Sequence, residues 1–195
     1  LQCGLVAGET VLIHAAGSGV GVAAIQIAKM MGASVVVGTA GSIEKLDRAK
    51  ALGVDAGANY KTEDFAEVAL QATGGRGVDV VLDVIGADYL EKNLRALAPK
   101  GRMVIVGLMG GSTTQANLGV LLQKRLQVRG TTLRARPIEE KGYATRAFEK
   151  SVLPHIASGR IKVIVDRVFP LSEAAAAQEY MASNQNFGKV VLAVG

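Results

Sequence analysis

The sequence has few of the residues that hold small secreted or metal-dependent domains together. Its 195 residues include a single cysteine, Cys3, and no tryptophan. One cysteine is too few for an internal disulfide or a cysteine-rich zinc site, and a chain of this length can bury a sizeable core without either. We therefore expect no bound metal and a protein of the reducing cytoplasm.

Long hydrophobic runs are also missing. Apolar residues make up 49% of the sequence, but glycine, proline or charged residues interrupt the apolar stretches well before the roughly 20 residues that a membrane helix needs. The 24 glycines follow no three-residue period, which excludes a collagen helix. With 20% charged residues, the composition does not fit a disordered chain, so a folded globular domain is predicted.

The charge balance favours an anionic partner. The formal net charge is +5, and the sequence pI is about 9.4. A nucleic-acid-binding protein would gather its cations on one face and interleave aromatic residues for stacking. Here lysine and arginine are spread along the whole chain and only 4% of residues are aromatic, so we expect no nucleic acid, and the charge alone leaves the kind of anion open.

Short apolar runs alternate with helix-forming segments in the first part of the chain. Strands are expected at residues 10–14, 34–38, 56–60, 78–83 and 102–107, and helices at 20–31, 42–52, from 62 onward and at 87–97. The strands are continuously apolar rather than alternating, which is typical of a parallel sheet covered on both faces. The predicted fold class is a doubly wound α/β sheet of the Rossmann type.

The second part of the chain is less regular. A sixth strand is expected at residues 126–130, a long helix at 139–158, a strand at 161–169, a turn at 170–172, a helix at 173–182 and a last strand at 189–194. We expect this tail not to repeat the βα rhythm and place a boundary near Ile161. Because the chain starts at Leu1 and enters a strand pattern almost at once, we also expect a fragment.

A glycine cluster, Gly17–Gly21, lies between the first strand and the first helix. Such a turn presents unpaired backbone N–H groups and the positive end of the helix dipole, which suits a pyrophosphate. The match to G-x-G-x-x-G is imperfect, because its three glycine positions hold Ala16, Ser18 and Gly21. A glycine-rich turn without a ligand therefore remains an alternative.

The end of the second strand discriminates between cofactors. NAD-binding proteins place an Asp or Glu there, on the ribose hydroxyls, and that acid would repel the extra phosphate of NADP. The segment Gly38–Ser42 contains no acid, and Lys45 follows within one helical turn. This pattern favours NADP, although Lys45 as a solvated cation and Ser42 as a helix cap are ordinary alternatives.

Several motifs in one order carry a resemblance that covers essentially the whole chain. They are Ile13–Gly21, Ala23–Ala28, Thr39–Ser42, Asn59–Phe65, Gly107–Gly111 and Gly188–Leu192. In these the chain resembles the zinc-independent quinone oxidoreductases of the medium-chain dehydrogenase/reductase superfamily. The resemblance implies residues 1–160 as an NADPH-binding domain and 161–195 as a C-terminal remnant of a GroES-like catalytic domain that is otherwise absent here.

The resemblance also implies a set of cofactor-binding residues. For the pyrophosphate these are Ser18, Gly19, Val20 and Gly21. For the adenosine 2′-phosphate they are Gly41, Ser42, Lys45 and Tyr60. Beside the nicotinamide they are Val84, Ile85, Gly107, Leu108 and Met109, with Thr131, Leu133 and Asn184 as further contacts.

Hydride transfer from NADPH needs orientation and a dry pocket more than acid–base residues. We therefore expect no catalytic side chain: His14 reads as a hydrogen-bonded core residue, His155 lies on the late helix, and Asp83 fixes a loop. None of the four tyrosines starts the Tyr-x-x-x-Lys pattern of short-chain dehydrogenases. The resemblance implies NADPH-dependent quinone reduction, with the fragment alone inactive. An enoyl-thioester reductase and a non-catalytic NADPH-binding protein stay open.

The strand expected at Leu126–Gly130 would be the last of the sheet. An edge strand has unpaired N–H and C=O groups that can pair with another chain. The arginines around it could simply protect a solvated edge: Arg125, Arg129, Arg134 and Arg136. The resemblance implies a homodimer in which this edge pairs with its twin.

Overall fold

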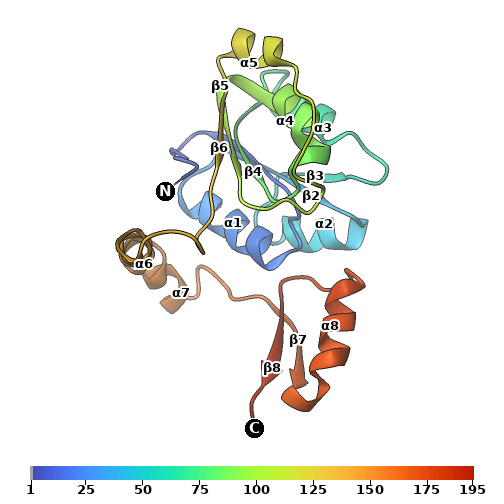
Figure 1. The fold of residues 1–195 in the computed structure, drawn as a ribbon, viewed down its shortest axis with the longest axis vertical. Coiled ribbons are helices and arrows are strands. Elements are labelled where there is room, and N and C mark those ends of the chain that lie inside the picture. The colour runs from blue at the N-terminus through green and yellow to red at the C-terminus, as the bar shows by residue number, and fades with distance from the viewer. Residues whose placement is uncertain (1) are drawn as a thin grey trace.

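The computed structural model describes residues 2–195 as two parallel sheets with their helices (Figure 1). The larger sheet has six strands in the order β3-β2-β1-β4-β5-β6. Its strands are β1 (Thr10–Ile13), β2 (Val35–Ala40), β3 (Ala56–Asn59), β4 (Val78–Asp83), β5 (Leu97–Ile105) and β6 (Gln127–Gly130). This order, with all neighbours parallel, confirms the predicted doubly wound Rossmann sheet.

Helices connect the strands on both sides of the sheet. They are α1 (Gly19–Met30), α2 (Ile43–Lys50), α3 (Phe65–Ala72), α4 (Leu90–Ala96), α5 (Leu118–Lys124), α6 (Ile138–Ser151), α7 (Leu153–Ala157) and α8 (Ala174–Ala182), with short 3₁₀ turns η1 (Ala87–Tyr89) and η2 (Leu171–Glu173). Among residues 2–195, none of these helices has the length and apolar character needed to cross a membrane.

Polar side chains start the first three helices. Ser18 accepts a hydrogen bond from the N–H of Gly21 (2.9 Å), and Ser42 accepts one from Lys45 (3.3 Å). Asp64 begins α3 in the same way, through Ala66 (3.0 Å). Each cap satisfies a backbone donor that the helix itself leaves unpaired. The helices α1 and α2 begin within one residue of the predicted positions, whereas α3 begins at Phe65, three residues after the expected start.

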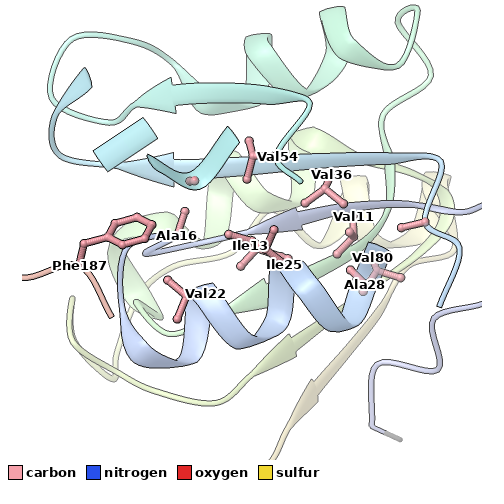
Figure 2. Packing of buried hydrophobic residues seen from close by; sticks show 12 residues of the cluster. Val11, Ile13, Ala16, Val22, Ile25, Ala28, Val36, Val54, Val80 and Phe187 are labelled. Atoms are coloured by element: carbon pink, nitrogen blue, oxygen red, sulfur yellow. The ribbon is translucent and has the colours of Figure 1, made fainter. Parts of the chain in front are cut away.

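The core forms on both faces of the sheet because neighbouring strand residues point to opposite sides. Ile13 faces α1, where Figure 2 shows it packed with Ile25 and the strand valines. Leu12 faces the other way, toward a cluster that includes Phe65 and Met103. Phe187, from the tail, is 2% exposed and joins the α1 side of the core.

Two predictions for the second part of the chain are wrong. The helix expected at 139–158 is divided into α6 and α7 at Val152, because Pro154 has no N–H to continue the helical ladder. The tail does repeat the βα rhythm: β7 (Val165–Pro170) pairs in parallel with β8 (Lys189–Ala193), with α8 as the crossover that a parallel pair requires. The short helix α5 was not predicted.

His14, which follows β1, is a buried core residue, as the sequence predicts. It is 1% exposed, its Nε2 lies 2.7 Å from Asn93 Oδ1, and its Nδ1 lies 3.1 Å from Thr39 Oγ1. The rings of Phe65 and Tyr89 meet it edge-on at 4.7 and 4.8 Å. Burial lowers the pKa of His14 from 6.5 to about 4, so the imidazole is neutral in the folded protein at pH 7.

This shift predicts a pH-dependent loss of stability. As pH falls from 7 to 5 the unfolded chain gains a proton at position 14 that the folded protein does not take up, which lowers the free energy of unfolding by about 2 kcal/mol. The loss begins near pH 6.5 and levels off near pH 4. His14→Gln should remove this component, so urea unfolding at pH 7 and pH 5 should show a smaller pH effect in the variant. An equal effect in both proteins would contradict the buried neutral imidazole.

Candidate cofactor-binding site

The residues expected to bind the cofactor lie at the carboxyl ends of the six parallel strands, where doubly wound sheets place their ligands. The turn after β1 holds Ser18–Gly21, the turn after β2 holds Gly41–Lys45, and Tyr60 follows β3. The remaining groups follow the other three strands: Val84 and Ile85 after β4, Gly107–Met109 after β5, and Thr131–Leu133 after β6.

The turn between β1 and α1 is shaped by close backbone packing. A Cβ on Gly21 would lie 2.2 Å from the carbonyl oxygen of Ala15, so only glycine lets α1 approach the strand end this closely. Ala15 itself has a φ of 51°. Gly21 is therefore required by the fold with or without a ligand. The side chain of Val20, by contrast, is 50% exposed at the surface of the turn.

Gly19 is a different case from Gly21. A Cβ at this position would meet only the flexible side chain of Lys189, whose Cε would be 2.3 Å away. The tail reaches the turn through its backbone as well, because the N–H of Gly188 donates to the carbonyl of Gly17 (2.8 Å). From the sequence, Lys189 is expected only as a residue of the last strand. It belongs to the motif Gly188–Leu192, but no local pattern predicts its contact with the glycine turn.

A second cluster lies beyond the ends of β2 and β3. A Cβ on Gly41 would be 2.6 Å from the hydroxyl of Tyr60, so glycine lets the tyrosine fold over this turn. Lys45 donates from Nζ to the backbone carbonyl (2.5 Å) and to Oδ1 (3.1 Å) of Asn184. The structure therefore brings Asn184, from the tail, next to Lys45, one of the residues expected around a 2′-phosphate.

The electrostatics of this cluster favour an anion. Burial lowers the pKa of the Lys45 ammonium, the nearby cations Arg48 and Lys61 lower it further, and the carboxylates of Asp166 and Glu44 oppose the shift. A negative ligand would offset both the lost hydration and the repulsion between the cations. The acid-free end of β2 adds no competing carboxylate.

The loops that follow β4 and β5 are joined to each other by backbone hydrogen bonds. The N–H of Met109 donates to Val84 O (3.3 Å), and that of Gly110 donates to Ile85 O (2.7 Å). Beneath them Asp83 is fully buried and accepts from the N–H of Ile85 (2.7 Å), which confirms its predicted role in fixing the loop. Burial raises the pKa of Asp83, while its backbone hydrogen bonds oppose the rise.

The last expected contacts are divided between two places. Thr131 continues the β5–β6 pairing, because its N–H donates to Ile105 O (2.9 Å). Leu133, 60% exposed, instead lines a hollow against α6 with Phe148 and Lys141. The structure therefore keeps Thr131 at the sheet edge and places Leu133 beside α6.

The residues present suit a dinucleotide and show no metal site. Within residues 2–195, no group of three or more His, Cys, Asp or Glu side chains lies close enough to hold a metal ion. The carboxyl edge offers a capped helix N-terminus, two glycines over which Lys189 and Tyr60 lie closely, and Lys45 beside them. This combination accommodates the phosphates of an NAD(P) molecule.

Comparison with known proteins agrees with this geometry. Residues 19–150 match the family described as zinc-binding dehydrogenase. The chain is 38% identical over 189 residues to 2-haloacrylate reductase from Burkholderia sp., which covers 95% of this chain and 55% of that protein.

Two solved structures superimpose well on the chain. Escherichia coli quinone oxidoreductase complexed with NADPH gives a TM-score of 0.83 at 36% identity, over 98% of this chain and 59% of that one. An NAD-dependent alcohol dehydrogenase gives 0.84 at 39% identity, over 100% and 53%. The chain thus spans little more than half the length of these relatives. It belongs to the zinc-binding dehydrogenase family of the medium-chain dehydrogenase/reductase superfamily and has that superfamily's NAD(P)-binding fold.

Proposed function

We propose that the protein is a zinc-independent, NADPH-dependent quinone oxidoreductase. The observation that carries the cofactor choice is the acid-free end of β2, where Tyr60 packs on Gly41, and Lys45 follows Ser42 with the cations Arg48 and Lys61 nearby. NADPH, when bound, supplies the hydride. The role of this chain is to hold the cofactor and orient its nicotinamide.

The residues named at the carboxyl edge divide this binding between them. The turn Ser18–Gly21 receives the pyrophosphate, and the cluster around Lys45 receives the 2′-phosphate. The paired loops at Val84–Ile85 and Gly107–Met109 lie where the nicotinamide would be bound. Their mutual hydrogen bonds and the buried carboxylate of Asp83 keep them in one position, which is the preorganisation that hydride transfer needs.

The proposal that the substrate is a quinone rests on similarity in sequence. The Escherichia coli quinone oxidoreductase supports it. The sequence motifs also resemble those of the p53-inducible quinone oxidoreductase. The zinc-independent mechanism is proposed from the resemblance of the sequence motifs to the zinc-independent quinone oxidoreductases and from the single cysteine, Cys3. We place the protein in the cytoplasm.

A reductase acting on an activated carbon–carbon double bond is the second candidate. The relative named for 2-haloacrylate favours it, because an acrylate carries a double bond conjugated to a carboxyl group, as an enoyl thioester does to its thioester. The same edge of the sheet would bind the cofactor in both enzymes. A third candidate, a protein that binds NADPH without turning it over, uses the same residues.

Steady-state NADPH oxidation by the full-length protein separates these functions. We expect oxidation with 1,4-benzoquinone or a substituted naphthoquinone and little or none with crotonyl-thioesters. Faster oxidation with the thioester would identify the enoyl-reductase alternative. Tight NADPH binding with no oxidation by either acceptor would identify the binding protein.

Lys45→Ala tests the cofactor choice. Loss of one charged contact to the 2′-phosphate should weaken NADPH binding by about ten- to a hundred-fold, or about 1.5–3 kcal/mol, with little change for NADH. Lys50→Ala on the same helix is the matched control, because Lys50 pairs only with the exposed Asp47. Fluorescence titration with both cofactors gives the dissociation constants. An equal loss for NADPH and NADH would rule out the 2′-phosphate role of Lys45.

We further propose that the tail after residue 160 belongs to the catalytic part of the whole protein. The β7–β8 sheet is separate from the six-stranded sheet, and its apolar side chains are largely exposed. Val168 is 57% exposed and Val191 38%. Such a face fits further protein packed against it.

The edge strand β6 supports a homodimer. All four of its residues are exposed, and Val128 is 43% exposed. The N–H of Thr131 points to β5, so by strand alternation that of Val128 points outward, away from the sheet. Pairing of this edge with its twin would join the two sheets across a two-fold axis.

Val128→Pro removes an outward N–H and should convert the dimer to a monomer without loss of the six-stranded sheet. Val128→Ala keeps the N–H and should remain dimeric. Sedimentation velocity of the full-length protein at micromolar concentration distinguishes the two states. A monomer before any substitution, or a dimer that survives Val128→Pro, would contradict edge pairing.

A further inference from the structure

The side chain of Gln26, on α1, attaches that helix to the linker between α7 and β7. Gln26 is 8% exposed, and the other buried residues of α1 carry no polar side chain. Its Nε2 donates to the carbonyl oxygen of Lys162 at 3.0 Å, and its Oε1 accepts from the N–H of the same residue at 2.8 Å. One side chain thus binds both backbone polar groups of a linker residue that lies 136 positions away in the sequence.

The helix does not need an amide at this position for its own sake. The remaining hydrogen bond of the Gln26 amide goes to the carbonyl of Val22, one turn earlier, which the regular i→i−4 pattern already pairs. An apolar side chain would fill the same space without the cost of removing an amide from water. The two hydrogen bonds to Lys162 are therefore the contribution that a glutamine makes here and an apolar residue could not.

The linker is open at its beginning and packed further on. Gly159 has a φ of 74°, and apart from its chain neighbours no residue has an atom within 4 Å of the place where its Cβ would be. Ile161 is 7% exposed, and Ile164 packs against the α1 side of the core. Lys162 lies between these two isoleucines, so the Gln26 amide fixes the linker between its open start and β7.

The linker is bound in turn to the segment that meets the glycine cluster after β1. The carbonyl of Ile164 accepts from the N–H of Lys189 (2.9 Å). The N–H of Gly188, the preceding residue, donates to the carbonyl of Gly17 (2.8 Å). A Cβ on Gly188 would lie 2.4 Å from the Ile164 carbonyl oxygen, so the two segments pack backbone against backbone. The linker is therefore bound to α1 on one side and to the segment 184–189 on the other.

We infer that Gln26 is a positioning residue for the candidate cofactor site. It holds the linker through Lys162, and the linker holds the segment 184–189. This segment borders the turn after β1 and, through Asn184, the ammonium of Lys45. Gln26 itself lies about two helical turns from the start of α1, so it acts on the cofactor only through these segments. The inference rests on the proposed function and adds to it a residue remote from the binding edge.

Binding is reciprocal, so a cofactor that prefers the held linker must also hold the linker more tightly. Tryptic cleavage after Arg160 and Lys162, two exposed linker residues, measures how often the linker opens in the full-length protein. Saturating NADPH should slow this cleavage about tenfold. The cofactor would not cover these bonds itself, because Arg160 and Lys162 line a hollow with Met30 and Leu52, near the C-terminal ends of α1 and α2 and away from the carboxyl edge of the sheet.

Gln26→Met, which keeps the length of the side chain and removes its hydrogen bonds, tests the residue directly. Cleavage of the linker should become about tenfold faster, and the affinity for NADPH should fall about three- to tenfold. Gln71→Met is the matched control, because Gln71 is an exposed glutamine on α3, and it should change neither quantity. Cleavage after Arg76, in an exposed loop before β4, is the internal reference for each digest and should respond neither to NADPH nor to the substitutions.

A lower melting temperature of Gln26→Met with unchanged NADPH affinity would overturn the inference, because the amide would then stabilise the fold without positioning the site. Linker cleavage that bound NADPH does not slow in the unmutated protein would overturn it as well, whether or not the variant folds. Both results would leave the proposed function intact. If the unmutated protein bound no NADPH, the proposed function itself would fail.

Discussion

A buried chain of four polar side chains ties together the strand ends on which the candidate site is built. Thr39, His14, Asn93 and Asp83 are each 1% exposed or less, and each is hydrogen-bonded to the next. They join β2, the end of β1, α4 and β4, and the last member holds the N–H groups of the loop after β4. Because unpaired polar groups at this depth would be costly, the chain fixes one arrangement of the edge.

The tail depends on the same edge for its own position. Phe187 enters the core beside the glycine turn, with the guanidinium of Arg48 over its ring at 4.3 Å. Arg48 also pairs with Asp166, which accepts from the hydroxyl of Tyr180 at 2.7 Å. The tail therefore holds the α2 helix through both Arg48 and Lys45, whose Nζ donates to Asn184, so docking of the tail and the shape of the candidate cofactor site are coupled.

Most of the sheet could be predicted from the sequence, since buried parallel strands are continuous apolar runs bounded by glycine and helix caps. The cap Ser42 and the buried His14 follow from the same local patterns. The prediction failed where the signal is not local. The parallel pairing of β7 with β8 depends on a register between distant segments, and α5 is too short for its periodicity to be seen. Lys189 was missed because only the fold brings it to Gly19.

The charged side chains at the candidate site bear on which part of the proposed reaction, cofactor binding or hydride transfer, this chain would support by itself. The cations Lys45 and Lys189 lie at the turns after β2 and β1, while the loops after β4 and β5 carry mainly backbone and apolar groups, with Asp88 beside Gly110 as an exposed acid. Leu108 and Met109 on those loops are 56% and 80% exposed. Hydride transfer requires a dry pocket, so these side chains need a covering surface before the nicotinamide is shielded from water. In the proposed function, this chain would bind the cofactor, and turnover would require a surface packed above these two side chains.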